Sequence, residues 1–167
     1  MERLRLYKIE DKYIRFLHGA DFRVQYNKQE RRPYIGVVLT IGEYNYFVPM
    51  ESPKPNHDKV KSGIHIMRLA GGHYGLLGFN NMIPVQEENL IAVDIAQEPD
   101  AKYRELLINQ LVFCNKHRNT IREHALKTYE AVTEKKTEFY TRICCDFKKL
   151  EKASSHYDPN YIPKKRK

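Results

Sequence analysis

Short runs of alternating apolar and polar residues fill the first half of the chain. Successive side chains of a β-strand point to opposite faces, so this alternation predicts strands with one buried face. Gly42-Glu43 and Ala70-Gly71-Gly72-His73 separate two pairs of runs and predict hairpin turns. The predicted strands cover residues 4–9, 34–41, 44–48, 64–69, 74–79, 82–85 and 90–95.

Helical spacing of apolar residues marks the remaining segments. Asp11 is predicted to cap a short helix that ends at Gly19. In the second half of the chain, Thr120 and Glu123 have the spacing of a capping box, which predicts that a helix begins there. Residues 139–150 are predicted to form a further helix or to continue that one. Because strands come first and most helices later, the pattern predicts an α+β fold with an antiparallel sheet.

Composition fits one globular domain. The chain has 167 residues, of which 41% are hydrophobic and 30% charged, enough to bury a core without metals or disulfides. We assign residues 1–160 to this domain and residues 161–167 to a basic C-terminal tail, whose lysines and arginine we expect to be solvated. Cys114, Cys144 and Cys145 form a poor disulfide framework and are expected to be reduced thiols.

The net positive charge of the chain indicates an anionic partner. The formal net charge is +8 and the pI about 9.3, so the chain attracts polyanions. Nucleic acid is the first candidate partner and an anionic membrane the second, although charge alone also fits an inert basic surface. The 12 tyrosines offer rings on which unpaired bases can stack. No apolar signal core or membrane-spanning run is visible, so we expect a cytoplasmic protein without membrane contact.

Known cofactor motifs are absent from the sequence. It contains no phosphate-binding glycine loop, no dinucleotide fingerprint and no His/Asp/Glu set with metal-ligand spacing. We therefore expect neither a cofactor nor a metal, and an enzyme of this sequence would work with side chains alone.

The segment Ser52-Pro53-Lys54-Pro55-Asn56-His57 is the most informative loop. Its prolines restrict the backbone and so hold polar side chains in fixed directions. Spacing and composition alone fit a proline-rich surface turn better than an active site, because such loops are common. Metal-free RNA cleavage, however, needs groups of the kind found here. Lys54 could accept the proton of a ribose 2′-hydroxyl if nearby positive charge favours its neutral form, Arg32 could grip phosphate oxygens, and Ser52 could hydrogen-bond the scissile phosphate.

Four motifs follow one another in the first half of the chain. They are Leu6-Tyr7-Lys8-Ile9 with Lys12-Tyr13-Ile14; Arg32-Pro33-Tyr34-Ile35-Gly36-Val37; an aromatic strand into Pro49 with Ser52-Pro53-Lys54 and His57; and Gly75-Leu76-Leu77-Gly78-Phe79-Asn80-Asn81-Met82-Ile83-Pro84-Val85. In this order they resemble the ToxN/AbiQ endoribonucleases of type III toxin–antitoxin systems, nearest to the branch that includes CptN. The helical second half is similar only in general character.

This resemblance implies a fold and an activity. The implied fold is a twisted antiparallel sheet or partial barrel, related to the Kid/MazF toxins, with helices around it. The implied activity is metal-independent cleavage of single-stranded, adenine-rich RNA that leaves a 2′,3′-cyclic phosphate. The implied partner is a repeat-derived pseudoknot RNA antitoxin, which the enzyme processes and which inhibits it in a closed protein–RNA assembly. The implied role is abortive phage infection.

The resemblance also assigns residues. It implies catalytic roles for Ser52, Lys54 and Arg32, where Arg32 replaces a family lysine. It further implies a set of RNA-binding residues, namely Tyr13, Tyr26, Lys28, Glu51, His57 and Asn81. Glu51 stands where relatives often carry a small hydroxyl residue, so its carboxylate could repel phosphate or tune Lys54.

Structural interpretations of the same residues stay open. Tyr13 could pack the first helix on the sheet, and His57 could fix the loop, which fits it better than catalysis. Asn80 and Asn81 could simply form a turn. For the whole chain, a non-catalytic RNA-binding module is the main alternative, and a DNA-binding regulator is a weaker one because no helix-turn-helix pattern stands out.

Overall fold

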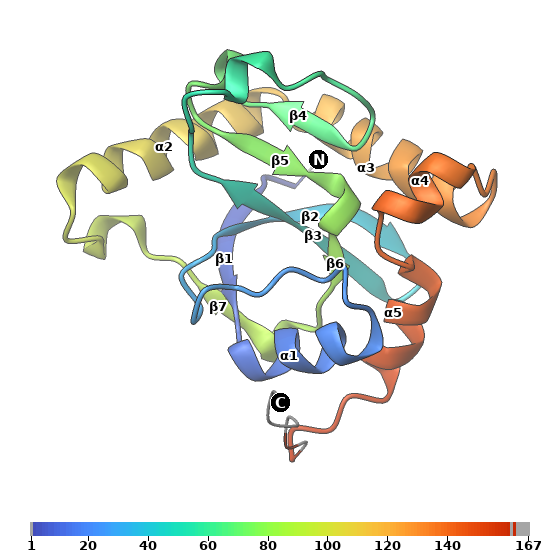
Figure 1. The fold of residues 1–167 in the computed structure, drawn as a ribbon. Coiled ribbons are helices and arrows are strands. Elements are labelled where there is room, and N and C mark those ends of the chain that lie inside the picture. Colours follow the sequence, from blue (N-terminus) through green and yellow to red (C-terminus); the bar gives the residue numbers. More distant parts are fainter. Residues whose placement is uncertain (1, 161, 163–167) are drawn as a thin grey trace.

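The structure is a computed structural model that describes residues 2–160 and 162 (Figure 1). Its centre is an antiparallel sheet of seven strands in the order β4-β5-β3-β2-β1-β7, with β6 paired to β3. The strands are β1 (Arg5–Ile9), β2 (Tyr34–Ile41), β3 (Tyr44–Glu51), β4 (Ile66–Arg68), β5 (Leu76–Gly78), β6 (Ile83–Pro84) and β7 (Leu90–Ala92). The predicted α+β class with an antiparallel sheet is therefore confirmed. The relation to the Kid/MazF barrel stays a prediction.

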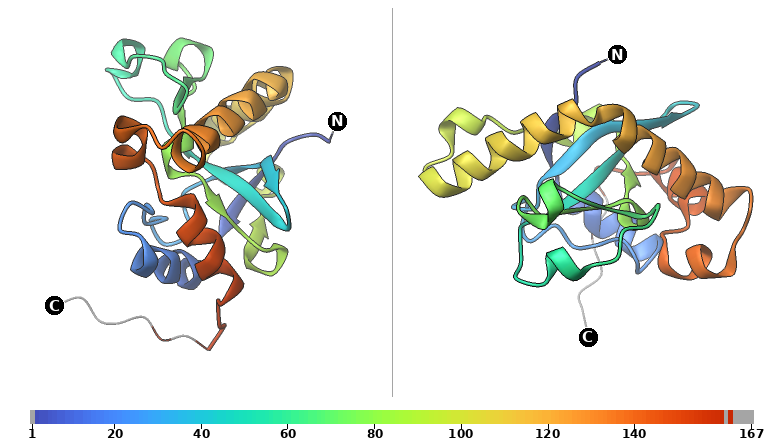
Figure 2. Two further views of the ribbon diagram at one scale, coloured as in Figure 1. Left: turned by 90° about the vertical axis from the view of Figure 1, so that its right-hand side faces the viewer. Right: turned by 90° about the horizontal axis from the view of Figure 1, so that it is seen from above.

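Five α-helices surround this sheet in the described residues. They are α1 (Asp11–Ala20), α2 (Ala101–Lys116), α3 (Arg118–Thr133), α4 (Glu138–Ile143) and α5 (Phe147–Ser155). Helices α1 and α5 lie side by side at one end of the molecule (Figures 1 and 2), and α5 also contacts β6. Helix α3 packs on β2 and β4. No described helix is long and apolar enough to cross a bilayer.

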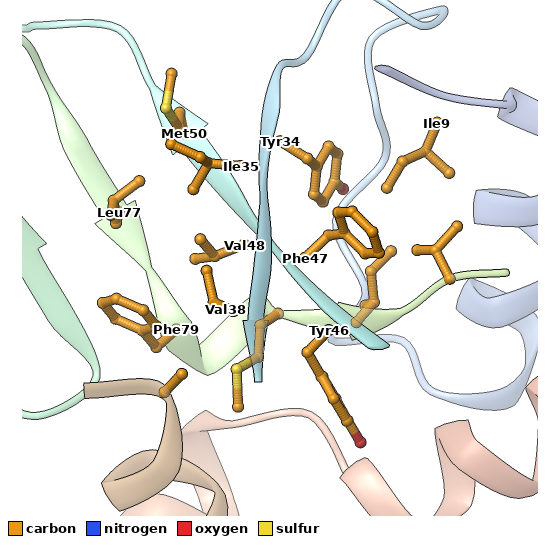
Figure 3. Packing of buried hydrophobic residues seen from close by; sticks show 14 of the residues in the cluster. Ile9, Tyr34, Ile35, Val38, Tyr46, Phe47, Val48, Met50, Leu77 and Phe79 are labelled. Atoms are coloured by element: carbon orange, nitrogen blue, oxygen red, sulfur yellow. The ribbon is translucent and has the colours of Figure 1, made fainter. Parts of the chain in front are cut away.

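The core lies around β2 and β3. In β3, five consecutive residues from Tyr46 to Met50 are buried, although a half-buried strand would alternate. The strand is therefore covered on both faces, as Figure 3 shows for Val48 and Phe47, which point to opposite sides. Buried side chains from both ends of the chain, such as Leu4 and Leu150, belong to the same hydrophobic cluster as those of β3.

Some predicted boundaries were wrong. Asp11 is the first residue of α1 and makes no capping hydrogen bond, because Glu10 occupies the cap position. Helix α3 begins at Arg118, so Thr120 lies inside it. The predicted third helix is divided into α4 and α5, because Asp146 accepts a hydrogen bond from the backbone N–H of Lys149 and so caps a new helix.

The predicted basic tail, residues 161–167, lies outside the described residues except for residue 162. The extent of the domain and tail thus stays a prediction.

Candidate active site

The antiparallel pairing of β2 and β3 creates the site. Tyr34, the first residue of β2, is opposite Pro49 near the end of β3, and Met50 N–H donates to Pro33 O at 3.0 Å. The residues just before β2 and just after β3 must therefore leave the sheet side by side. This pairing brings Arg32 to the loop that begins at Ser52, although 19 intervening residues separate them in the sequence.

A pocket of about 350 Å³ forms at this point. Its lining includes all three predicted catalytic residues, Arg32, Ser52 and Lys54, and two of the predicted RNA-binding residues, Lys28 and Glu51. Arg31 and Tyr103 also line it, so four cations face one carboxylate. A concave, cationic site of this kind suits a phosphate group.

Three of the four cations, Lys28, Arg31 and Arg32, belong to a loop with uncommon backbone angles. Three successive non-glycine residues, Lys28, Gln29 and Glu30, have φ values of 53°, 59° and 66°. Asn27 anchors the loop through two hydrogen bonds. Its buried side-chain Nδ2 donates to Ile9 O at 2.6 Å, and its backbone carbonyl accepts the backbone N–H of Arg32 at 3.1 Å. Backbone in this left-handed region is held only where the surroundings fix it. The hydrogen bond from Asn27 thus attaches the loop that carries Lys28, Arg31 and Arg32 to the end of β1.

Arg32 is held by a backbone contact. Its Nε donates to Tyr26 O at 3.3 Å, which leaves the terminal nitrogens of the guanidinium available to the pocket. Guanidinium groups bind phosphate oxygens well in such an orientation. Arg32 therefore lies in the same pocket as Ser52 and Lys54, and its role in phosphate binding stays a prediction.

A second pocket, of about 380 Å³, adjoins the first. Glu51 and Lys54 line both pockets, so they stand at the boundary between them. The second pocket combines apolar walls with side-chain amides, which are those of Gln25, Asn56, Asn80 and Asn81. Asn81 is held on both sides, since it accepts from Gln25 Nε2 at 2.9 Å and donates to Arg23 O at 2.9 Å.

His57 lies beneath the loop, where it lines the second pocket while being almost fully buried. Only 4% of the residue is exposed, and its Nε2 is 3.6 Å from Glu51 Oε2. The structure therefore favours the loop-fixing interpretation over direct RNA contact. It also gives Glu51 a partner, so this carboxylate faces an imidazole as well as the pockets.

Two predicted RNA-binding residues are not part of either pocket. Tyr13 is fully buried, and its hydroxyl donates to Pro84 O and is hydrogen-bonded to Ser154. Burial raises the pKa of its hydroxyl. No RNA can reach this ring in the described fold, so its prediction as an RNA contact was wrong and the packing interpretation holds. Tyr26 is partly exposed, but its ring stacks on His18 at 4.1 Å instead of lining a pocket.

Sequence reasoning also missed site residues. Tyr103 comes from α2 and was not among the predicted site residues. Gln25, Asn56 and Asn80 gave no periodic signal because they lie in irregular segments. Arg31 could have been found, because it directly precedes Arg32. In the described part of the chain, no three His, Cys, Asp or Glu side chains are grouped so as to hold a metal ion.

The chain is similar to known proteins of one family. The family described as "Toxin ToxN, type III toxin-antitoxin system" matches residues 5–155. Endoribonuclease ToxN of Bacillus thuringiensis subsp. kurstaki is 32% identical over 162 residues, covering 92% of this chain and 84% of that protein.

Two solved structures have the same fold. One, from work on selective toxin inhibition by a non-coding RNA pseudoknot, has a TM-score of 0.83 and 32% identity and covers 93% of this chain and 98% of its own. The other is AbiQ, a lactococcal anti-phage endoribonuclease, with a TM-score of 0.83, 29% identity and the same coverage. From the family match over most of its length, together with these likenesses, the chain belongs to the ToxN family of type III toxin–antitoxin toxins.

Proposed function

We propose that this protein is an endoribonuclease toxin that cleaves single-stranded RNA at the pocket lined by Arg32, Ser52 and Lys54. The observation that carries the proposal is the convergence of these three side chains in one cationic pocket of about 350 Å³. Family membership supports the same activity, since both ToxN and AbiQ are named endoribonucleases.

The residues suit attack by the ribose 2′-hydroxyl on the adjacent phosphorus. In this scheme Lys54 accepts the 2′ proton while the 2′ oxygen–phosphorus bond forms. Arg32 and Ser52 stabilise the negative charge on the phosphorane oxygens. The bond to the 5′ oxygen then breaks, and that oxygen takes a proton. A 2′,3′-cyclic phosphate and a 5′-hydroxyl result, with no metal required.

The adjoining pocket would hold a base next to the cleaved bond. The exposed amide of Asn56 lines this pocket and offers both a donor and an acceptor, which is the pair that recognises the edge of adenine. This supports a preference for adenine-rich sites. In the cell, we propose that an RNA antitoxin folded as a pseudoknot occupies this site, since inhibition by such an RNA is described for a solved structure with this fold. The likeness to AbiQ, a lactococcal anti-phage endoribonuclease, supports an anti-phage role, which we propose this protein performs in the cytoplasm.

Lys54→Ala tests the catalytic proposal. We expect it to lower RNA cleavage by about 100-fold or more, because the proton acceptor is lost. Lys59→Ala is the matched control, since Lys59 is an exposed lysine of the same loop that lines neither pocket. It should cleave like the wild type. Expression without the partner RNA should arrest bacterial growth for the wild type and Lys59→Ala but not for Lys54→Ala.

Two further measurements separate the alternatives. Cleavage that persists in excess chelator, with a cyclic phosphate on the product, supports the metal-independent reaction. Undiminished cleavage by Lys54→Ala would contradict the mechanism. Salt-sensitive RNA binding without any product would instead favour the non-catalytic RNA-binding module.

The base pocket has its own test. Asn56 is exposed and lines the second pocket, so Asn56→Ala should leave folding intact. We expect this variant to lose discrimination between adenine and other bases in cleavage-site profiling, by about tenfold. An unchanged profile would place base recognition elsewhere.

A further inference from the structure

Lys54 lies in a backbone segment with a single hydrogen-bond donor. It is flanked by Pro53 and Pro55, which have no backbone N–H. The N–H of Lys54 is thus the only main-chain donor from Pro53 to Pro55. The group that accepts this bond controls the direction in which the lysine leaves the loop, because the prolines already restrict the neighbouring φ angles.

His57 holds both backbone polar groups of Lys54. Its ring Nδ1 accepts the Lys54 N–H at 3.3 Å, and its own N–H donates to Lys54 O at 3.0 Å. His57 is buried while residues 52–56 are all exposed. The exposed loop is therefore attached to the body of the protein through this histidine.

The other ring nitrogen faces Glu51. His57 Nε2 is 3.6 Å from Glu51 Oε2, at the end of β3. An imidazole that accepts at Nδ1 must carry its proton on Nε2, and the carboxylate is placed to favour that tautomer. A chain of contacts therefore runs from the carboxylate through the ring to the backbone of Lys54.

The surrounding turn is built around this arrangement. A Cβ on Gly72, whose φ is +99°, would lie 3.1 Å from the carbonyl carbon of His57 and 3.2 Å from its Cβ. A Cβ on Gly75 would lie 1.8 Å from Glu51 O. The turn before β5 thus packs directly against both Glu51 and His57, which leaves them little freedom to move.

We propose that His57 is a positioning residue, which aims the Lys54 amine at the scissile phosphate through the backbone, with Glu51 selecting the Nε2–H tautomer. The inference rests on the proposed ribonuclease activity. It goes beyond that activity by assigning roles to a buried histidine at the edge of the second pocket and to a carboxylate that lines both pockets. A displacement of about 1 Å at a reacting group is enough to slow catalysis by about 100-fold.

Two isosteric substitutions separate the two ring nitrogens. In His57→Asn the side-chain oxygen takes the place of Nδ1 and keeps the acceptor for Lys54 N–H, whereas in His57→Gln the amide reaches the place of Nε2 and that acceptor is lost. We expect His57→Asn to keep a kcat at least about tenfold above that of His57→Gln, with similar KM for a short RNA and similar Tm. Equal kcat values for the two folded variants would overturn the proposal.

The wild-type protein provides a second measurement, which needs no variant. In a ¹⁵N-resolved spectrum of the histidine side chains, His57 should show a protonated Nε2 and an unprotonated, hydrogen-bonded Nδ1. A proton on Nδ1 would overturn the proposal whether or not the variants fold. Failure of the wild type to cleave RNA would sink the proposed function instead, and the spectrum would still test the contacts of His57.

Discussion

The lack of a side chain at Gly75 allows the turn before β5 to pack against the start of the loop that carries Ser52 and Lys54. At Gly75, a Cβ would lie 1.8 Å from Glu51 O and 3.3 Å from Pro53 N. The backbone at Gly75, just before β5, therefore lies so close to the end of β3 that no side chain fits at this position. Gly71 has a similarly left-handed φ of +65°, but no atom lies within 4 Å of a Cβ built there. Comparing substitutions at Gly75 and Gly71 therefore distinguishes the cost of a steric clash from the cost of a left-handed backbone conformation.

Gly75→Ala should destabilise the protein far more than Gly71→Ala. Gly71→Ala carries only the cost of a left-handed residue, about 1 kcal/mol. Gly75→Ala adds a backbone clash, and we expect a total loss of about 3 kcal/mol or more. Urea unfolding of both variants measures the difference. Equal losses would show that the approach of β5 to β3 is not as close as described.

The thiols offer a second test at the residue scale. Cys114, Cys144 and Cys145 are free and buried. Burial raises the pKa of the Cys114 thiol to about 12 and that of Cys144 to about 12. Because the thiolate is the reactive form, none of the three should react with Ellman's reagent at pH 8 in the folded protein, and all should react in denaturant. Rapid modification of the native protein would contradict this burial.

Between elements, one buried carboxylate joins β3, α3 and α5. Glu151 of α5 accepts a hydrogen bond from Tyr46 of β3 at 2.6 Å and one from Tyr129 of α3 at 2.7 Å. Burial, followed by the contact with Glu151, raises the pKa of the Tyr46 hydroxyl, so it stays protonated and donates. This arrangement fixes two helices to the strand that ends at the active site.

Removing these hydroxyls should cost stability more than additively. Tyr46→Phe and Tyr129→Phe should each lose about 1.5 to 3 kcal/mol, because each removes a hydrogen bond to a charged group. The double variant should lose more than the sum, since Glu151 would then keep only Lys148, whose Nζ is 3.6 Å from its other oxygen. Urea unfolding of the four proteins gives the coupling energy. Simple additivity would show that the two hydrogen bonds act independently.

At the scale of the whole molecule, Asp21 joins the first and last parts of the chain. It lies after α1 and is buried, and it accepts from Arg23 Nε at 2.9 Å and from the backbone N–H of Asp146 at 2.7 Å. Arg23 in turn donates to Thr141 O at 2.7 Å. Burial raises the pKa of Asp21, but the hydrogen bonds from Arg23 and Asp146 outweigh it and hold the pKa below its ordinary value.

The protein should therefore lose stability in acid through Asp21. A group whose folded-state pKa is depressed contributes stability that is fully present above its unfolded value of about 3.9 and is lost as the pH falls through the folded value. We expect Asp21→Asn to lower stability at neutral pH and to flatten its fall as the pH drops below about 4. Glu43→Gln, in an exposed turn, is the control. An Asp21→Asn profile parallel to the wild type would contradict this role.

The sequence by itself determined the parts of this protein that depend on local patterns. Alternation placed β2 at residues 34–41 and the turn at Gly42-Glu43, because a strand with neighbouring turn residues needs no distant information. The two prolines marked a stiff loop, and the ordered motifs led to the family. Arg32, Ser52 and Lys54 were predicted in this way, and the structure places all three in the lining of one pocket.

Tertiary structure decided what depends on distant neighbours. Alternation failed in β3 because the strand is covered on both faces, and Tyr13 looked available to RNA until the packing of α1 against α5 and β6 buried it. Tyr103 entered the pocket from a helix more than 40 residues away from Lys54 in the chain. The contacts of His57 with Glu51 and Lys54 depend on the packing of the turn before β5 against it, which the sequence did not predict. Local sequence sets which groups are present, whereas burial and pairing between distant segments determine which of them meet.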